Sequence, residues 1–162
     1  MTSMGGKDFL ELESRIVLLT AAIGHDVAHP GLTNKFLLES NHPFALDFEQ
    51  GSAVLEQMHA STTLHLLERH KLFSFASEEK EKSMKHLLVQ CILNTDMNVH
   101  MKLLSAAQSL IHARENQLAL PLPKDDEEMF ASFLLHCADI SNAAKPWTTA
   151  FKWSQLVMQF VS

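Results

Sequence analysis

Residues 9–31 read FLELESRIVLLTAAIGHDVAHPG, and this stretch decides most of what can be predicted about the fold. Apolar side chains recur in it every three or four residues, as in a helix that buries a face: Phe9, Leu12, Ile16, Leu19 and Ile23. Further apolar residues occupy the other faces. We therefore expect a mostly buried helix over 8–23 that ends near Gly24, before the turn at Pro30-Gly31.

The same helical spacing returns along the rest of the chain, and no segment shows the period-two alternation of a strand. We therefore predict an all-α fold, with Ser52 and Ser77 as N-caps of their helices. Breaks are expected at 41–43 and at the proline-containing stretch 118–123. Beyond the first helix, helices are expected at 33–38, 52–70, 77–95, 99–113, 125–139 and from 147 onward.

The composition fits one globular domain or a part of one. The chain has 162 residues, of which 46% are hydrophobic and 20% charged. Nineteen acidic against thirteen basic residues give a net charge of −6 with no basic cluster, which argues against binding to nucleic acid or to an anionic membrane. The longest apolar run, Ile16–Ile23, is too short to cross a bilayer.

Two cysteines, Cys91 and Cys137, lie in apolar surroundings without the spacing of a zinc-thiolate site. They are expected to be buried thiols, as in a reducing compartment. No signal peptide precedes the first apolar run. These features indicate an intracellular, cytoplasmic location.

The pair His25-Asp26 ends the first apolar helix, and Asp139 ends a second apolar segment over 133–140. A charged aspartate at the end of a buried helix is costly unless it is paired or bound to a cation. The chain has two apolar helices that each end in an aspartate, and His29 lies four residues after His25. These residues suggest that side chains from the two helix ends meet and bind one divalent ion.

Each candidate also has a simpler structural interpretation. His25 can be a hydrogen-bonded core histidine and Asp26 the cap of the next turn, while Glu56 and His59 can belong to a solvated helix face. Asp96 can cap the helix that starts near residue 99. Five further histidines have no ligand-like spacing and are expected on the surface: His65, His70, His86, His100 and His112.

Four blocks, in the same order, resemble those of the class I 3′,5′-cyclic nucleotide phosphodiesterases. Residues 24–37 (GHDVAHPGLTNKFL) are similar to the family's HDxxHPGxxNxFL segment, and residues 52–59 (SAVLEQMH) to its SVLENHH block. Residues 92–97 (ILNTDM) resemble ILATD(M/L), and residues 136–142 (HCADISN) resemble HCADLSN. Lys145-Pro146 and Trp153 match as well, so the resemblance runs from about Leu10 to Val161.

The resemblance implies a compact helical domain that hydrolyses cyclic AMP, cyclic GMP or both to nucleoside 5′-monophosphates in cyclic-nucleotide signalling. His25, Asp26 and Asp139 would bind a first metal, usually zinc. Asp26 would also reach a second, usually magnesium or manganese. Two metals so placed would neutralise the cyclic phosphate and activate a water that attacks phosphorus in line.

The remaining site residues follow from the same resemblance. His29, Glu56 and His59 would orient water molecules around the metals. Asn142 would lie near the nucleotide, and the pocket wall would contain Thr95, Asp96 and Met97.

Departures from the family pattern are equally specific. The family's general-acid histidine and fourth ligand of the first metal come from an HNxxHA segment, which these 162 residues do not contain. The helix that carries its purine-binding glutamine and stacking phenylalanine is missing as well. Ala28 stands in place of a second aspartate, and Gln57-Met58 in place of Asn-His.

We therefore expect residues 8–162 to be the central part of a catalytic domain, after a flexible segment 1–7, and to be weak or inactive alone. The final helix is still apolar at Val157 and Met158 close to Ser162, as in a domain that is incomplete at both ends. The alternative is a non-catalytic metal- or partner-binding remnant that associates, as a homo-oligomer or with a homologue, through exposed apolar faces. A general HD-type phosphohydrolase is a third candidate, but it lacks the Glu56 and 95–96 blocks.

Overall fold

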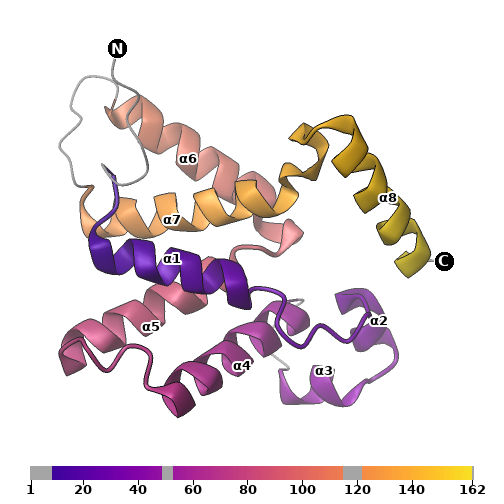
Figure 1. The fold of residues 1–162 in the computed structure, drawn as a ribbon, viewed down its shortest axis with the longest axis horizontal. Helices are drawn as coiled ribbons and strands as arrows, with labels where there is room; N and C mark the ends of the chain where they lie inside the picture. The colour runs from indigo at the N-terminus through magenta and orange to yellow at the C-terminus, as the bar shows by residue number, and fades with distance from the viewer. Residues whose placement is uncertain (1–8, 49–52, 115–121, 162) are drawn as a thin grey trace.

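The computed structural model describes residues 9–48, 53–114 and 122–161, and every regular element in these ranges is a helix (Figure 1). The all-α prediction is confirmed. In chain order the elements are α1 (Leu12–Gly24), α2 (Asn34–Glu39), α3 (Pro43–Asp47), α4 (Val54–His70), α5 (Glu78–Leu93), the 3₁₀ turn η2 (Met97–Val99), α6 (His100–Arg114), α7 (Lys124–Asp139), the 3₁₀ turn η3 (Ile140–Ala144) and α8 (Trp147–Val161).

Most helix starts lie within one residue of the predicted positions. Ser77 caps α5, since its hydroxyl accepts a hydrogen bond from the Lys80 N–H. By contrast, Ala53 precedes α4 without a side-chain cap, and Ser52 lies outside the described residues. The expected flexible segment 1–7 and most of the loop 118–123 lie outside them too.

The short helix α3 was not predicted, because the sequence from Asn41 to Pro43 favours a break. Pro43 occupies the first helical position, where its missing N–H removes no hydrogen bond. The His42 ring nitrogen Nδ1 accepts from the Phe44 N–H and caps the helix. A proline that usually stops a helix therefore starts one here.

The prediction that α1 is mostly buried is correct for one face only. Ser14, Val17, Ala21 and Gly24 are buried, whereas Leu19 and Ile23 are 67% and 86% exposed. α1 packs against α5, α7 and α4, which cover that single face, so the apolar residues of the opposite face lie at the surface.

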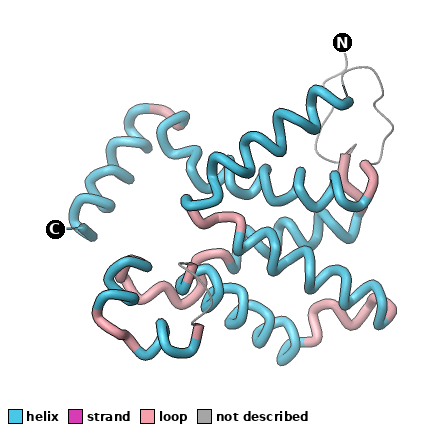
Figure 2. The backbone as a smooth tube through the Cα atoms, turned by 180° about the vertical axis from the view of Figure 1, so that it is seen from behind, coloured by secondary structure: helices cyan, strands magenta, loops and turns pink. Residues whose placement is uncertain are grey.

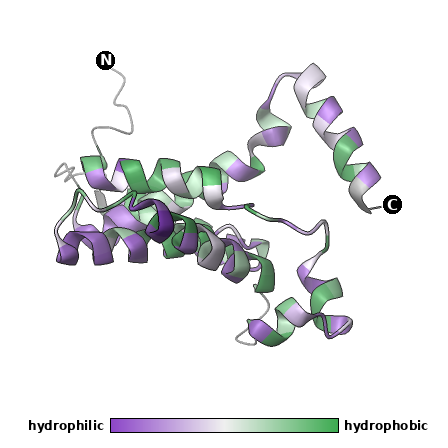
Figure 3. Cartoon of the chain, turned by 60° about the horizontal axis from the view of Figure 1, so that its bottom comes forward, coloured by the Kyte–Doolittle hydropathy of each residue, from purple (hydrophilic) through white to green (hydrophobic). Residues whose placement is uncertain are grey.

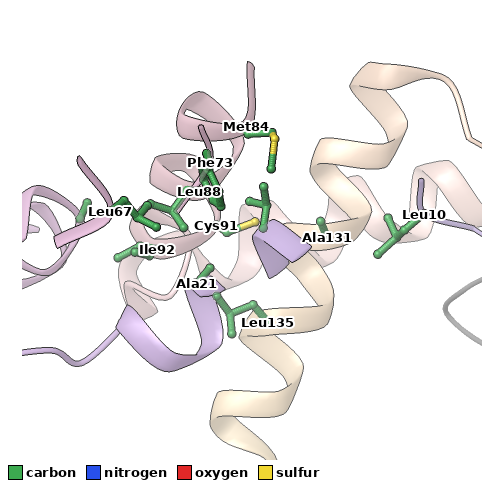
Figure 4. Packing of buried hydrophobic residues seen from close by; sticks show 12 residues of the cluster. Leu10, Ala21, Leu67, Phe73, Met84, Leu88, Cys91, Ile92, Ala131 and Leu135 are labelled. Atoms are coloured by element: carbon green, nitrogen blue, oxygen red, sulfur yellow. The ribbon is translucent and has the colours of Figure 1, made fainter. Parts of the chain in front are cut away.

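Helices α1, α4, α5 and α7 share one core, and Figure 2 shows the four from behind. Val17, Leu88 and Ile92 are fully buried there, and the small side chains of Ala21 and Ala131 let α1 approach its neighbours closely (Figure 4). Full burial of one such aliphatic side chain stabilises the fold by about 1.5–3 kcal/mol. This core holds the C-terminal ends of α1 and α7 in place.

The two cysteines differ in burial. Cys91 belongs to the core, and loss of hydration there raises the pKa of its thiol to about 12. The prediction of a buried thiol is confirmed for Cys91, whereas Cys137 is half-buried.

A second, smaller core joins α2 and α3 to the start of α4. It contains Leu37, Ala45, Val54, Leu55 and Met58. Met58, one of the departures from the family pattern, is 6% exposed. An apolar side chain there is explained by packing.

The end of α1 lies close against α4 at Gly24. A Cβ at this position would lie 2.5 Å from Thr63 Oγ1 and 2.7 Å from its Cγ2. The Thr63 hydroxyl donates to the Gly24 carbonyl at 3.1 Å. Only glycine allows this contact, which sets where the next residues, His25 and Asp26, are presented.

Helix α8 projects away from the helical body (Figure 3) and packs against η3. Its large apolar side chains are exposed, with Trp147 at 76% and Met158 at 65%. Among the described residues, no helix is long and apolar enough to cross a membrane.

The Gly24 contact predicts a specific coupling between two substitutions. Gly24→Ala should destabilise the chain by about 2 kcal/mol through steric overlap, and Thr63→Ala by about 1 kcal/mol through loss of a buried hydrogen bond. Because Thr63→Ala removes the two atoms nearest the new Cβ, the double variant should be more stable than the sum predicts by about 1 kcal/mol or more. Urea denaturation of the four proteins measures this, and strict additivity would contradict the close contact.

Candidate metal centre

The candidate residues meet where the C-terminal ends of α1 and α7 approach α4. His25 caps α1, and its N–H donates to the Ala21 carbonyl at 2.8 Å. A tight turn follows, in which the Val27 N–H donates to the Gly24 carbonyl and the His29 N–H to the Asp26 carbonyl. The turn therefore presents His25, Asp26 and His29 from one short rigid segment.

This turn has an unusual backbone at Ala28. Its φ of 59° lies in the left-handed region, which costs a residue with a Cβ about 1–2 kcal/mol and is best tolerated by glycine, asparagine and aspartate. Gly31, with φ 76°, meets the same demand without that cost. The aspartate that the family pattern has at position 28 suits this backbone better than alanine does.

His25 lies between two carboxylates. Its Nε2 is 3.4 Å from Asp139 Oδ1 and 3.5 Å from Asp26 Oδ2, while its Nδ1 lies 3.0 Å from the Ala22 carbonyl. The hydrogen bond to Asp139, helped by the Ala22 carbonyl and by the Asp26 charge, raises the pKa of His25 to about 9. Without a bound metal, the ring is therefore a cation that bridges α1 and α7.

Asp26 also faces α4 through its second oxygen. Oδ1 lies 3.8 Å from His59 Nε2, and the His29 ring stacks on the His59 ring with centroids 5.4 Å apart. One donor atom from each of Asp26, His29 and His59 lies within 4.8 Å of the others. The alternative interpretation that His59 belongs to a solvated helix face is wrong, because its side chain is only 3% exposed.

His59 is oriented by the backbone of the turn. Its Nδ1 lies 2.7 Å from the Val27 carbonyl, to which it donates. Loss of hydration lowers the pKa of His59, and this effect outweighs the Val27 hydrogen bond and the Asp26 charge. The ring is therefore neutral at pH 7.

Glu56 is held to α2 by Asn34, a residue of the 24–37 block to which no separate role was assigned from the sequence. Asn34 Nδ2 donates to Glu56 Oε2 at 2.8 Å, and Asn34 Oδ1 accepts from the Leu55 N–H at 2.7 Å. Asn34 thus caps the start of α4 from another helix, where Ala53 supplies no side-chain cap. Burial, with the charges of Asp96 and Asp26, raises the pKa of Glu56.

The predicted pocket residues lie on the neighbouring turns. Asp96 is buried, and its Oδ1 accepts from the Asn98 N–H at 2.9 Å. It therefore caps η2, the 3₁₀ turn that leads into α6, and not the α-helix near residue 99 that the alternative interpretation named. The Thr95 hydroxyl donates to the Ile92 carbonyl, and Met97 is 60% exposed. Asn142 lies on η3, and its Oδ1 accepts from Nζ of Lys145, the residue that follows η3.

The prediction of surface histidines holds for four of the five. His65, His70, His86 and His112 are exposed, but His100 is half-buried and its Nδ1 lies 2.9 Å from Nε2 of the buried His136. His136 Nδ1 lies in turn 3.0 Å from the Asn94 carbonyl. Residues 36 positions apart meet here, and spacing along one helix gives no signal for such a pair.

The donor types suit a divalent cation, but the three predicted ligands of the first metal do not form one compact group. Asp26, His29 and His59 each have a donor atom within 4.8 Å of the others, whereas His25, Asp26 and Asp139 are not grouped in this way. A tetrahedral zinc with bonds of about 2.0–2.1 Å keeps its ligand atoms about 3.3–3.4 Å apart. The distances from His25 Nε2 to the two carboxylates are 3.4 and 3.5 Å. The donor set of imidazole nitrogens and carboxylate oxygens is also the one that such metals take in proteins.

Known sequences resemble the chain over nearly its full length. The family profile described as 3′5′-cyclic nucleotide phosphodiesterase matches residues 1–161. The chain is 33% identical over 156 residues to the rat 3′,5′-cyclic-AMP phosphodiesterase 4C, covering 93% of this chain and 28% of the relative. It is also 33% identical over 143 residues to the dual specificity calcium/calmodulin-dependent 3′,5′-cyclic nucleotide phosphodiesterase 1 of Drosophila melanogaster, covering 87% of this chain and 16% of that protein.

A solved structure has the same fold. The phosphodiesterase domain of the RhoPDE fusion protein from the choanoflagellate Salpingoeca rosetta superimposes with a TM-score of 0.86 at 28% sequence identity. The match covers 95% of this chain and 49% of that one. The chain thus spans about half the length of that domain and less than a third of the two curated relatives.

The cap from Asn34 predicts different effects for two substitutions. Asn34→Ala removes both hydrogen bonds and should cost about 1–2 kcal/mol of stability, with a slightly smaller cost at pH values where Glu56 is protonated, since the Asn34 amide lowers the pKa of Glu56. Asn34→Asp keeps an acceptor for the Leu55 N–H but sets a carboxylate against Glu56, so its cost should shrink as the pH falls and one carboxyl is protonated. Denaturation between pH 4 and 8 measures both, and identical profiles would contradict the two-sided role of Asn34.

The His25–Asp139 pair predicts a pH dependence of the chelator-treated chain. Because the pKa of His25 is raised from 6.5 to about 9 on folding, protonation of His25 stabilises the folded state. This stabilisation is complete at pH values below 6.5 and is lost as the pH rises through about 9. The loss should be of order 2 kcal/mol after solvent screening. NMR titration of His25 together with denaturation at pH 6 and 10 measures it.

Asp139→Asn is the control for that titration. It should return the pKa of His25 toward 6.5 and flatten the dependence of stability on pH. An unchanged pKa in the variant would contradict the pairing.

Proposed function

Because the chain belongs to the 3′,5′-cyclic nucleotide phosphodiesterase family, we propose that its site takes part in metal-dependent hydrolysis of cyclic AMP, cyclic GMP or both to nucleoside 5′-monophosphates. The observation that carries the proposal is the shared carboxylate of Asp26. One of its oxygens faces His25, which also contacts Asp139, and the other faces His59. Such a carboxylate can bind two cations at once.

The family depends on divalent metals, and we propose which residues hold them here. His25, Asp26 and Asp139 would hold a first metal, zinc, and Asp26 would contribute to a second position for magnesium or manganese. Bound metals of this kind neutralise phosphate charge and make water a nucleophile at neutral pH.

The surrounding residues have supporting parts in the proposal. Glu56, with its raised pKa and its amide partner Asn34, is suited to hold a proton or to accept one from water. His29 and His59 would orient groups around the metals. Thr95, Asp96, Met97 and Asn142 would line the nucleotide pocket.

We further propose that residues 8–162 form the central part of a longer catalytic domain. The partial coverage of the relatives supports this, since the chain matches 49% of the Salpingoeca domain. The HNxxHA string of the family is absent from the 162 residues. That string carries the family's general acid for the leaving 3′ oxygen. These 162 residues therefore lack this acid, and their turnover alone is expected to be slow.

The partner-binding alternative is supported by α8. Its exposed apolar side chains, Trp147 and Met158 among them, form a surface on which a second copy or a homologue could pack. Self-association stays a prediction.

The free thiol of Cys91 supports the proposed reducing, cytoplasmic location.

The metal proposal predicts the effect of removing Asp26. Asp26→Ala should lower bound zinc to background, because both metal positions lose their shared carboxylate, whereas the exposed Asp47→Ala on α3 should bind as the original chain does. Elemental analysis after dialysis measures the metal content.

The same proteins test the chemistry. Any conversion of cyclic AMP or cyclic GMP to the 5′-monophosphate in zinc and magnesium should be lost with Asp26→Ala and kept with Asp47→Ala. Unchanged metal content in Asp26→Ala, or turnover that survives it, would overturn the proposed function.

A further inference from the structure

Helices α5, α6 and α7 line a cleft that is separate from the candidate metal centre. α7 packs against both α5 and α6, and Figure 1 shows α6 running beside α7. The cleft has a volume of about 250 Å³, and none of its lining residues is a predicted metal ligand or pocket residue. Pockets for drug-sized ligands usually measure about 300–1,000 Å³, so this cleft suits a smaller molecule.

The floor of the cleft carries two amides and a buried hydroxyl. Gln90 and Asn94 lie one turn apart on the same face of α5 and line the cleft together. Asn94 Nδ2 donates to the hydroxyl of the fully buried Ser132 at 3.1 Å, which fixes the amide. The family pattern has an alanine at position 94. The polar floor is therefore a feature of this chain rather than of the motif block.

Charges of opposite sign line the cleft from two helices. Lys102 on α6 supplies an ammonium group, whereas Asp125 and Glu128 on α7 supply carboxylates. Glu128 Oε2 lies 3.5 Å from Nε2 of His86. In the described ranges, Lys102 and Asp125 belong to no ion pair, although they line the same cleft. The cleft therefore presents a cationic and an anionic group that do not neutralise each other directly.

The remaining walls are apolar. Leu103 on α6 is 6% exposed, and Met129 on α7 is half-buried. Val99 and Ala106 complete this surface. A ligand that satisfies all of these groups needs an ammonium group for the α7 carboxylates, a carboxylate for the α6 lysine, and an apolar body for the walls.

We propose that this cleft binds a small zwitterion with an apolar side chain, namely a free α-amino acid of the size of leucine. Its ammonium group would contact Asp125 and Glu128, its carboxylate Lys102, and its side chain Leu103 and Met129. The amides of the floor offer further donors and acceptors. Because two carboxylates and one ammonium group line the cleft, an anion such as a nucleotide is disfavoured there.

Titration of the chain with L-leucine tests the binding. The side-chain amide signals of Gln90 and Asn94 should shift in ¹H–¹⁵N NMR spectra, with a dissociation constant of about 0.1–1 mM for so small a ligand. The amide signal of Asn41, which does not line the cleft, should stay unchanged. Unchanged Gln90 and Asn94 signals at about 10 mM leucine would overturn the proposal.

Matched ligands test whether both charges are recognised. L-Leucinamide keeps the ammonium group of leucine but not its carboxylate, and 4-methylpentanoate keeps the carboxylate but not the ammonium group. Each should bind at least about threefold more weakly than leucine, as expected for exposed ion pairs. Equal binding of the three ligands would overturn the zwitterion site.

Substitutions assign each charge to its helix. Lys102→Gln should weaken leucine about threefold or more without weakening leucinamide, and Asp125→Asn should weaken leucine without weakening 4-methylpentanoate. Lys82→Gln, exposed on α5, is the matched control, and circular dichroism checks the fold of all three variants. Leucine binding that is equal in Lys102→Gln, Asp125→Asn and the control would contradict the proposed contacts.

The zwitterion site and the proposed function are tested separately. Because no lining residue of the cleft belongs to the metal centre, Asp26→Ala should bind leucine as the original chain does. Failure of leucine binding would refute this site and leave the metal proposal unaffected. Failure of zinc binding would refute the proposed function and leave the leucine site unaffected.

Discussion

The close contact between α1 and α4 at Gly24 and Thr63 is the constraint on which the site depends. It brings the backbone at the end of α1 against α4, so that the next turn places Asp26 beside His59. The Val27 carbonyl then receives the His59 ring. A change that widened this crossing would separate the carboxylate from one of its two imidazoles while leaving the main core largely intact.

The sequence predicted the helices well because apolar spacing and caps are local signals. Ser77 is an example, and Pro43 shows the limit, since a proline can end or begin a helix. The candidate metal residues came from motif resemblance. Asn34 and His136 stand in the motif blocks at 24–37 and 136–142, but their hydrogen bonds to Leu55 and His100 could not be predicted, because the partners lie 21 to 36 residues away and only the packing of helices brings them together.

The departures from the family pattern have separate physical consequences. Met58, which stands where the family pattern has a histidine, packs into the smaller core, so a polar side chain is replaced by a buried apolar one. Ala28 occupies a left-handed backbone position at some conformational cost. Both changes lie in the segments that carry the candidate ligands, yet neither removes a donor atom of His25, Asp26 or His59.

Both tryptophans of the chain, Trp147 and Trp153, lie on α8, outside the four-helix core. Intrinsic fluorescence therefore reports the environment of this one helix, while far-ultraviolet circular dichroism reports all of them. The two signals need not change together during unfolding. A fluorescence transition that is interpreted as unfolding of the whole chain would describe a change at α8 alone. For the same reason, tryptophan fluorescence would report directly on any molecule that binds to α8.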